Sequence, residues 1–275
     1  MPNALFAPPF LYGTAWKEDR TGALTELAIR TGFRGIDTAN QRKHYFESGV
    51  GEALGTVYRA GLVKRADLFL QTKFTYQRGQ DHRLPYDPAA TLTVQVRQSL
   101  TSSLDHLATS YVDSFVLHGP SSAEWDEPDG EVWSAMRQER DAGRARLLGV
   151  SNVSLRHLEQ MKVRNAELPA FVQNRCFARF GWDREVRAFC EKHKIVYQGF
   201  SLLTANPEVL SHPPFQNLAR SFDTTPEQVV FSFARAIGIL PLTGTSRGEH
   251  MRQDLDALQL TLPPNVVEAI ESMAG

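Results

Sequence analysis

Eight short apolar segments recur along the chain of 275 residues, and longer amphipathic or charged segments separate them. Each apolar segment starts as a nearly continuous hydrophobic run, which is typical of a parallel strand covered on both of its faces. We therefore predict eight strands, at Phe10–Ala15, Gly35–Ala39, Leu68–Phe74, Tyr111–His118, Ala145–Ser151, Ala170–Arg175, Ile195–Phe200 and Ile239–Gly244.

Helices are expected between and after these strands. The best defined is Ala89–Leu107, which Asp87 can cap. In Thr225–Ile237, the first residue can be the N-cap and Gln228 the returning partner of a capping box. Four further helices are predicted at Ser154–Asn165, Arg184–Lys194, Gly248–Leu258 and Pro264–Met273.

Eight strands that alternate with helices fit either a doubly wound sheet or a closed barrel. The count of eight, the regular spacing and the absence of a GxGxxG turn favour a (β/α)8 TIM barrel in the α/β class. No linker or change of composition divides the sequence, so we expect residues 1–275 to form a single domain. A barrel carries its active site at the C-terminal ends of its strands, and polar residues are expected there.

The composition is that of an ordinary globular protein, with 42% hydrophobic and 22% charged residues. Lys and Arg total 30 against 31 Asp and Glu, and this balance gives no reason to expect nucleic acid as a partner. The first residues lack the pattern of a signal peptide, and no apolar stretch approaches the roughly 20 residues that span a bilayer. We expect a cytoplasmic protein without a membrane partner, and monomer and dimer both stay open.

Polar residues stand where the predicted strands end. Asp37 closes the second strand, Lys73 the third and His118 the fourth. Taken singly, these could be a turn former, a solvated lysine and a core histidine. Burying such groups separately would cost several kcal/mol of hydration, so neighbouring strand ends should bring them together as one coupled group. Their joint placement therefore indicates a functional site.

Several ordered motifs resemble the aldo-keto reductases. FRGIDTANQRKHYFESGVGEAL (33–54) is similar to the family's Ile-Asp-Thr-Ala segment, with a following tyrosine and Val-Gly-Glu-Ala. LFLQTKF (68–74) resembles its lysine strand, and YVDSFVLHGP (111–120) resembles its histidine strand, with Asp113 in register. ARLLGVSN (145–152) and VQNR (172–175) resemble its Gly-Val-Ser-Asn and Gln-Asn strands, so the resemblance covers nearly the whole chain.

The resemblance implies an NAD(P)H-dependent enzyme that reduces aldehyde or ketone carbonyls. Tyr45 would donate the proton to the carbonyl oxygen, and Lys73 would help this phenol, whose free pKa is about 10. Asp37 would pair with Lys73, and a neutral His118 would orient the carbonyl. The nicotinamide cofactor would carry the redox chemistry.

One departure concerns the tyrosine. Family members commonly place it about five residues after the aspartate, whereas Asp37 and Tyr45 are eight positions apart. His44 and Tyr45 are thus adjacent candidates. Tyr45 is preferred because it precedes Glu47 and the Val-Gly-Glu-Ala helix much as the family tyrosine does. The alternative is that Tyr45 only packs against the start of that helix.

By the same matching, Ser151, Asn152 and Gln173 would bind the nicotinamide carboxamide, and Phe200 would stack on the ring. Strand-end caps and core packing are the alternative roles for these residues. The other cofactor-binding positions that the resemblance implies are Gly13, Thr14 and Asp37, with Ser201 and Leu202 near the pyrophosphate.

The segment ILPLTGTSRGEHMRQDL (239–255) resembles the part of the family that holds the adenosine 2′-phosphate. The usual Pro-Lys-Ser is not intact, because Leu242 follows the proline. Arg247 could still bind a phosphate with both arms of its guanidinium, and Thr245 and Ser246 could donate from their hydroxyls. NADP(H) is therefore predicted over NAD(H), which stays possible.

Trp16, Phe74 and Trp125 could wall an apolar substrate pocket, although each could instead anchor a loop. The chain ends soon after its last predicted helix, without the long C-terminal loop that closes the pocket in many relatives. An open site that accepts varied small-molecule aldehydes or ketones is therefore expected.

Two rival functions stay open. A cofactor-binding redox sensor of the same fold would show little turnover, although the complete acid–base set favours catalysis. An aldolase or isomerase could use Lys73 as a Schiff base or require a ligand cluster. No metal site is expected, and Cys176 and Cys190, which form no CxxC pair, are predicted as buried apolar side chains.

Overall fold

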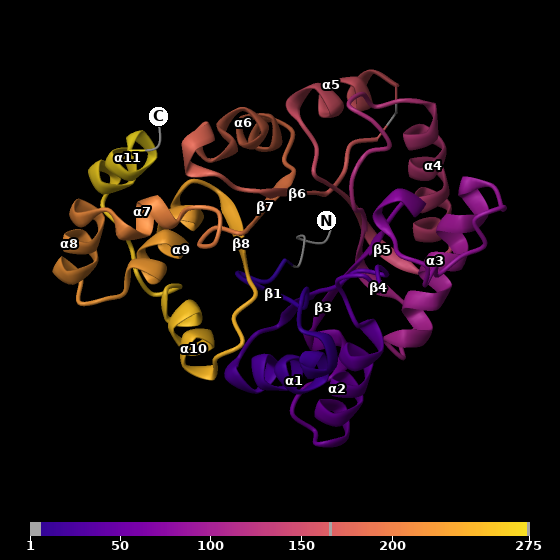
Figure 1. Ribbon diagram of the computed structural model, residues 1–275, viewed down its shortest axis with the longest axis horizontal. Helices are drawn as coiled ribbons and strands as arrows, with labels where there is room; N and C mark the ends of the chain where they lie inside the picture. Colours follow the sequence, from indigo (N-terminus) through magenta and orange to yellow (C-terminus); the bar gives the residue numbers. More distant parts are fainter. Residues whose placement is uncertain (1–6, 165–166, 274–275) are drawn as a thin grey trace, which may run out of the picture.

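The computed structural model describes residues 7–164 and 167–273, and its eight strands form a closed barrel. Every strand pairs in parallel with the next one along the chain, and the last pairs with the first. Figure 1 looks into this ring, with the strands at the centre and the helices outside. The predicted (β/α)8 barrel is confirmed. Its strands are Leu11–Gly13 (β1), Gly35–Asp37 (β2), Phe69–Phe74 (β3), Val112–Leu117 (β4), Ala145–Ser151 (β5), Phe171–Arg175 (β6), Val196–Phe200 (β7) and Ile239–Thr243 (β8).

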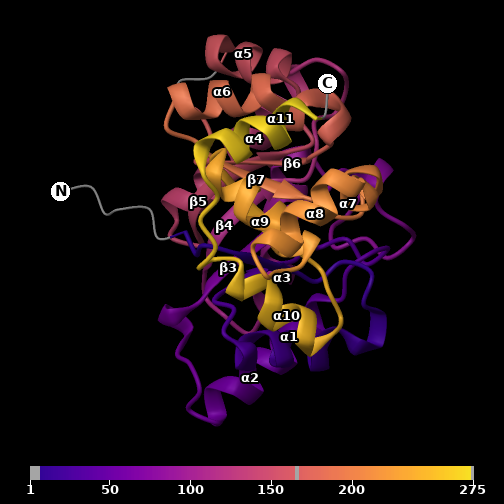
Figure 2. The ribbon, with the colours of Figure 1, turned by 90° about the vertical axis from the view of Figure 1, so that its left-hand side faces the viewer.

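The helices surround the strands on all sides in Figure 1. Figure 2 faces the side that carries the last part of the chain, where α8, α9 and α10 lie together. The α-helices are Thr21–Thr31 (α1), Glu47–Arg59 (α2), Leu92–His106 (α3), Glu127–Asp141 (α4), Leu155–Arg164 (α5), Arg184–Lys192 (α6), Pro207–Ser211 (α7), Pro213–Ser221 (α8), Pro226–Ala236 (α9), Gly248–Asp256 (α10) and Pro264–Ser272 (α11).

The N-termini of α9 and α3 test two capping predictions. At α9 the Thr225 side chain accepts from the backbone of Gln228, and the Gln228 side chain returns to the cap backbone, so the predicted capping box is confirmed. The predicted start of α3 was wrong. Thr91, which is extended, caps that helix, whereas Asp87 accepts from Ala89 in a turn before it.

The helix predicted at 154–165 is α5, and Asn165 lies outside the described residues.

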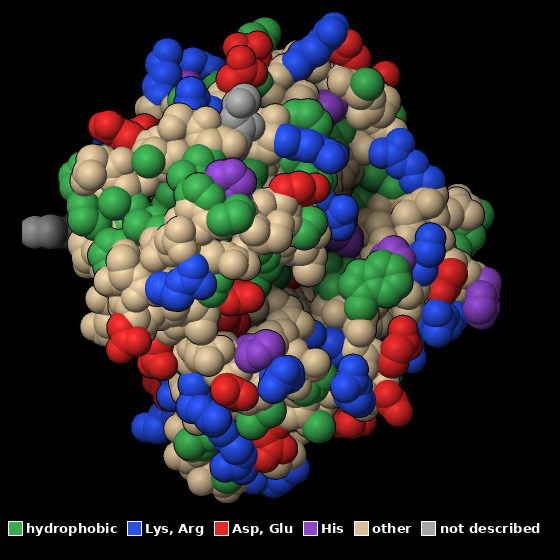
Figure 3. Space-filling model, turned by 60° about the vertical axis from the view of Figure 1, so that its left-hand side comes forward, with side chains coloured by type: hydrophobic (Ala, Val, Ile, Leu, Met, Phe, Trp, Pro, Cys, Tyr) green, Lys and Arg blue, Asp and Glu red, His purple; other side chains and the backbone are tan. Residues whose placement is uncertain are grey.

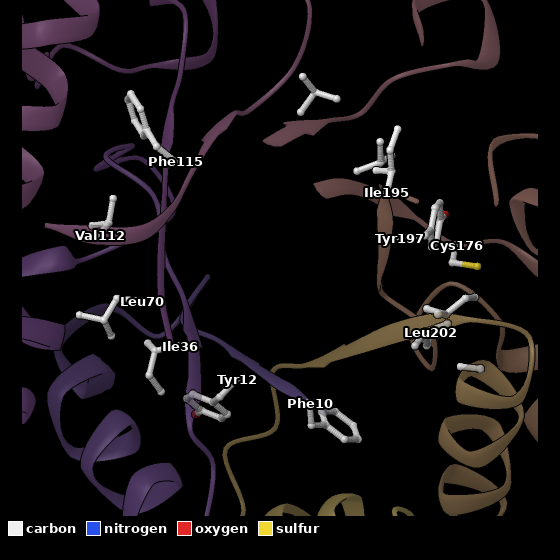
Figure 4. Packing of buried hydrophobic residues seen from close by; sticks show 14 of the residues in the cluster. Phe10, Tyr12, Ile36, Leu70, Val112, Phe115, Cys176, Ile195, Tyr197 and Leu202 are labelled. Carbon is white, nitrogen blue, oxygen red and sulfur yellow. The ribbon is translucent and has the colours of Figure 1, made fainter. Parts of the chain in front are cut away.

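Alternate side chains of each strand face the helices and form the main apolar core. Tyr12, Ile36 and Leu70, on three successive strands, belong to one buried cluster with helix residues such as Leu24 and Val50. Figure 4 shows Tyr12, Ile36 and Leu70 on the outer side of the strands. This layer attaches the helices to the barrel wall, because apolar area leaves water on both elements at once.

The other side chains point into the barrel and form layers along its axis. The bottom layer is apolar and consists of Leu11, Phe69, Phe171 and Leu240. Two residues further along a strand, the side chain returns to the same side. Barrel interiors are usually filled by branched apolar residues. Here the second layer is polar instead, and it consists of Asp37, Gln71, Gln173 and Gln198, all buried. Above it, Lys73 follows Gln71 by two residues and is also fully buried.

A glycine in the Val-Gly-Glu-Ala segment allows two helices to approach closely. A Cβ atom on Gly51 of α2 would lie 1.9 Å from the carbonyl oxygen of His106 at the end of α3. No side chain fits there without a backbone shift. The position of α2 sets the loop that precedes it, and that loop contains Tyr45.

We predict that Gly51→Ala lowers the free energy of unfolding by about 2 kcal/mol, because the added methyl group overpacks a rigid backbone contact. The matched control is Gly55→Ala on the same helix, where the nearest heavy atom to the added methyl is the flexible end of Arg59 at 3.1 Å. That change should leave stability unchanged or raise it by up to about 1 kcal/mol. Urea unfolding of both variants tests this, and equal effects would contradict the packing argument.

Candidate active site

The centre of the site is a buried ion pair. The Lys73 ammonium lies 2.7 Å from both carboxylate oxygens of Asp37 and donates to the Thr38 carbonyl at 2.8 Å. Burial lowers the pKa of Lys73, and the carboxylate of Asp37 opposes that change. The ammonium thus has three acceptors in an interior position where an unpaired cation would be strongly unfavourable.

The polar layer supports Asp37 from below. Gln71 and Gln173 donate amide hydrogens to one oxygen of Asp37, at 2.7 and 3.0 Å. Gln71 and Gln198 exchange two hydrogen bonds, at 2.8 and 3.0 Å, and Gln173 also donates to Gln198 at 2.9 Å. Donors on β3 and β6 therefore hold the carboxylate in place, and Gln198 of β7 holds both glutamines. Gln71 and Gln198 are not among the residues predicted from the sequence, although each directly follows the apolar start of its strand.

Tyr45 reaches this ion pair from the loop between β2 and α2. The Lys73 ammonium lies 5.3 Å from the centre of its ring, and the ring of His118 packs against it edge-on at 5.9 Å. Burial raises the pKa of the Tyr45 phenol, and the carboxylate of Asp37 adds to the rise. Burial and the neighbouring carboxylate thus both favour the protonated phenol.

The unusual spacing before Tyr45 is taken up by a turn. The backbone N–H groups of His44 and Tyr45 both donate to the carbonyl of Gln41, at 3.0 and 2.9 Å. The turn carries His44 away from the ion pair, and its ring stacks on Trp16 with 3.9 Å between the ring centres. Trp16 also donates its backbone N–H to the His44 carbonyl at 2.8 Å. The structure thus brings Tyr45, and not His44, to Lys73.

His118 is held as a neutral imidazole. Burial, together with the nearby Lys73 and His44, lowers its pKa to about 3. Its Nδ1 atom lies 2.7 Å from the hydroxyl oxygen of Thr75. Among the described residues the Thr75 hydroxyl has no other acceptor, so a donation to Nδ1 gives it a partner. The ring proton is then on Nε2, where it can be donated to a ligand.

Tyr45 and His118 line one end of a cavity of about 720 Å³, within the range of ligand sites. The cavity continues past the ends of β5, β6 and β7 to the helices α9 and α10, where Glu227 and His250 line it. In Figure 3 this hollow is visible, with basic, acidic and histidine side chains around it.

Most residues predicted to bind a cofactor line this cavity. They are Gly13, Asp37, Ser151, Asn152, Gln173, Phe200, Thr245 and Ser246. Asn152 has a positive φ of 55°, a strained conformation for a residue other than glycine, and its amide donates to the His118 carbonyl at 2.7 Å. The barrel therefore places two rows of polar groups, at β5–β6 and after β8, along a single cavity.

Four predicted cofactor residues do not line the cavity. The buried Thr14 hydroxyl donates to the Asp37 carbonyl at 3.1 Å, and Ser201 (φ 58°) turns the chain out of β7. Leu202 is buried in the apolar core, and the two residues after it line the cavity instead. Arg247 is exposed, and its guanidinium lies 3.4 Å from the carboxylate of Glu249.

Of the predicted substrate residues, only Trp16 lies at the cavity, with 69% of its surface exposed. Phe74 is fully buried against Tyr76 and Tyr86, because its neighbour Lys73 occupies the inward position of β3. Trp125 packs edge-on against a second tryptophan of the core, with the ring centres 6.4 Å apart. Both are loop and core anchors, so their predicted placement in the pocket was wrong.

Several cavity residues were not predicted from the sequence. Lys17 and Arg20 come from the connection between β1 and α1, and His250, Gln253 and Asp254 come from α10. One oxygen of Asp254 is buried without a hydrogen-bond partner, and burial raises the pKa of this carboxyl to about 7. The spacing of four between His250 and Asp254 places both on one helix face, which is the signal that could have found them.

Three structural expectations concern features outside this cavity. Cys176 and Cys190 are both free and buried, as predicted. In residues 7–164 and 167–273, no group of three or more His, Cys, Asp or Glu side chains is arranged to hold a metal ion. Within the same ranges, no helix combines the length and the apolar character that crossing a membrane requires.

Comparison with known proteins identifies the family. The model for the family described as "Aldo/keto reductase family" matches residues 12–274. The chain belongs to this family. It is therefore an oxidoreductase of the group that uses nicotinamide cofactors and reduces carbonyl compounds.

The relatives agree in sequence and in fold. An uncharacterised oxidoreductase of Schizosaccharomyces pombe is 26% identical over 99% of this chain and 90% of its own length. The crystal structure of an aldo/keto reductase from Brucella melitensis has a TM-score of 0.82 and 24% identity, over 96% of this chain and 93% of that one. An aldo-keto reductase of Bombyx mori in complex with NADP has a TM-score of 0.81 and 22% identity, over 97% and 89% of the two chains.

We predict that Asp254→Asn makes the melting temperature less dependent on pH. The folded-state pKa of Asp254 is about 7, against 3.8 ordinarily, so the native state holds an extra proton between these values. Stability should then fall as the pH rises through this window, and the asparagine variant should escape that loss. Compared with wild type, it should melt several degrees higher at pH 8 and almost equally at pH 4.

The matched control is Asp256→Asn, an exposed carboxylate on the same helix. Its effect on the melting temperature should be similar at both pH values. Equal shifts for Asp254→Asn at pH 4 and pH 8 would contradict a raised pKa.

Proposed function

We propose that this protein is an NADP(H)-dependent reductase of aldehydes or ketones, with Tyr45 as the proton donor. The observation that carries the proposal is the convergence of Tyr45, a neutral His118 and the Lys73–Asp37 ion pair at one end of a single cavity. A carbonyl oxygen gains negative charge as it is reduced, and proton donors stabilise that charge.

The residues divide the chemistry between them. His118 donates a hydrogen bond from Nε2 to the carbonyl oxygen and orients it. Tyr45 then transfers its phenolic proton to that oxygen, and the Lys73 ammonium stabilises the phenolate that forms. Asp37 holds the ammonium in place, and the three glutamines of the polar layer hold Asp37. When the reduced nicotinamide is bound, it supplies the hydride that forms the new bond at the carbonyl carbon.

The cavity has polar groups that fit a nicotinamide dinucleotide. Gln173 uses its amide hydrogens on Asp37 and Gln198, which leaves its oxygen to accept from a carboxamide. Ser151 and Asn152 add further polar groups beside it, and the ring of Phe200 offers a stacking surface. The NADP-bound Bombyx mori relative supports the same cofactor class for this chain.

The rival functions are less well supported. An aldolase would need Lys73 as a nucleophilic amine, but its ammonium is held by two carboxylate oxygens and a carbonyl. A redox sensor would need only the cofactor cavity. Such a sensor would not require a protonated Tyr45 beside a neutral His118, whereas a carbonyl reductase would. The site therefore favours an enzyme over a sensor.

We predict that Tyr45→Phe lowers kcat by about 10²- to 10⁴-fold, because the general acid is lost while the ring remains. Its affinity for NADPH, measured by fluorescence titration, should stay within about threefold of wild type. The control is Tyr58→Phe on α2, whose buried hydroxyl has no hydrogen-bond partner. Turnover is measured with a panel of aldehydes and ketones.

The wild-type titration separates the functions. Absence of NADPH and NADH binding would overturn the proposed function. Binding without turnover of any carbonyl compound would favour the sensor, and unchanged turnover in Tyr45→Phe would remove Tyr45 from its role.

The preference for NADP(H) is tested through Arg247. Thr245 and Ser246 line the cavity beside it, and Arg247 could bind a 2′-phosphate by leaving Glu249, which lies 3.4 Å away. We predict that Arg247→Ala weakens NADPH binding by about fivefold and leaves NADH binding unchanged, as expected for one exposed charge-assisted contact. An unchanged preference for NADPH in this variant would exclude Arg247 from cofactor selection.

A further inference from the structure

Gln198 is a buried residue of β7 whose side chain hydrogen-bonds only to other glutamines. Among the described residues, its partners are Gln71 and Gln173. β3, which carries Gln71, lies opposite β7 in the closed ring, so the two bonds between Gln71 and Gln198 cross the interior of the barrel. Branched apolar side chains usually fill that space, and burying an amide there is unfavourable unless it is hydrogen-bonded. The three glutamines therefore call for a functional explanation.

Gln71 and Gln173 bridge the same two oxygen atoms. Each donates to Oδ1 of Asp37, at 2.7 and 3.0 Å, and each also donates to Oε1 of Gln198, at 2.8 and 2.9 Å. One hydrogen bond leaves an amide free to rotate about that bond, whereas a second acceptor fixes the plane of the amide. Gln198 is this second acceptor for both glutamines, and its own amide donates to Oε1 of Gln71 at 3.0 Å.

The fixed plane determines where the oxygen of Gln173 points. Both amide hydrogens of Gln173 are used inside the polar layer, and the residue also lines the cavity. In the part of the chain that the structure describes, its Oε1 atom accepts no hydrogen bond, so it is open to a donor in the cavity. Because an amide group is planar, two acceptors that hold its nitrogen also hold its oxygen. An acceptor held in this way can select a ligand by a single hydrogen atom.

The same bridges restrain the ion pair. The Oδ1 atom of Asp37 that receives both glutamine hydrogens also accepts from the Lys73 ammonium at 2.7 Å. Gln198 holds both glutamine nitrogens from the opposite side, so neither donor can turn away from Asp37 without losing a second bond. The carboxylate at the ammonium and the open oxygen at the cavity thus share one support.

We propose that Gln198 is a positioning residue for both halves of the reaction. By fixing Gln173, it aims an acceptor oxygen at the carboxamide of the nicotinamide, and by fixing Gln71, it holds Asp37 against Lys73. The inference rests on the proposed function and adds to it a residue that does not line the cofactor cavity. Gln198 would thereby couple recognition of the carboxamide to the placement of the groups that support the proton donor.

The first test is Gln198→Met, which keeps a side chain of similar length and removes its hydrogen bonds. Its probes are NADP+ and the 3-acetylpyridine analogue of NADP+, in which a methyl group replaces the amide nitrogen of the carboxamide. Wild type should bind NADP+ about tenfold more tightly than the analogue, as for one hydrogen bond. The variant should bind the two within about twofold of each other, and its kcat should fall about tenfold because the reacting groups are less well placed. Calorimetric titration measures both affinities without a carbonyl substrate.

The second test is Gln198→Glu, which separates hydrogen bonding from packing. A protonated glutamic acid can accept from both glutamines through its carbonyl oxygen and donate its O–H to Gln71, so it reproduces all three bonds of the layer. Burial beside the Asp37 carboxylate favours the protonated acid, and at about pH 6 this variant should recover the discrimination and the kcat of wild type. Wild type and Gln198→Met are measured at the same pH.

The matched control is Gln95→Met on α3. This glutamine is also buried, and its amide donates to the Ala90 carbonyl at 2.8 Å, outside the barrel interior. The change removes the same chemical group from the protein. Discrimination between the two cofactors and kcat should both stay within about twofold of wild type.

Three results would overturn the inference and leave the proposed function standing. The first is unchanged discrimination and kcat in Gln198→Met. The second is an equal loss of affinity for both cofactors, or a loss that Gln198→Glu does not reverse, which would assign Gln198 to packing. The third is a wild type that binds NADP+ and its analogue equally. A wild type that binds neither NADP(H) nor NAD(H) would overturn the proposed function as well.

Discussion

The ion pair between Lys73 and Asp37 is the interaction on which the rest of the site depends. Two charges inside a barrel are tolerable only when nearly every lone pair and proton has a partner. The Thr38 carbonyl accepts a further hydrogen bond from the ammonium, and Gln71 and Gln173 donate hydrogen bonds to the carboxylate. Burial keeps the phenol of Tyr45 protonated and His118 neutral, and the charges of the fixed pair add to both effects, Asp37 on the phenol and Lys73 on the imidazole. The hydrogen bonds that stabilise the buried pair are therefore the same ones that position the groups of the site.

Much of this centre could be predicted because of a simple geometric property. The C-terminal ends of parallel strands meet at one rim, so Asp37, Lys73 and His118 had to converge once the barrel was inferred. The alternation of side chains along a strand fixes two further positions. If Lys73 points inward, Phe74 must point outward, and a polar residue two positions before Lys73 must lie inside the barrel. The buried position of Phe74 and the role of Gln71 follow from that rule.

Other features depend on tertiary contacts that no local pattern shows. The turn at Gln41 returns Tyr45 to the ion pair despite the longer spacing, and its geometry depends on hydrogen bonds across the loop. Leu202 was expected at the cofactor, but the strained backbone at Ser201 directs the next side chain into the core. The far end of the cavity is built by α10, whose helix position was predicted but whose inward face was not.

The connection after β1 links the two ends of the cavity. Trp16 stands at the exposed rim and is joined by hydrogen bonding and stacking to the loop that carries Tyr45. Lys17, one peptide bond away, is anchored against the end of β8. One short segment therefore holds both the exposed rim of the cavity and its wall near β8. A substitution that alters the backbone of this segment is expected to affect both places.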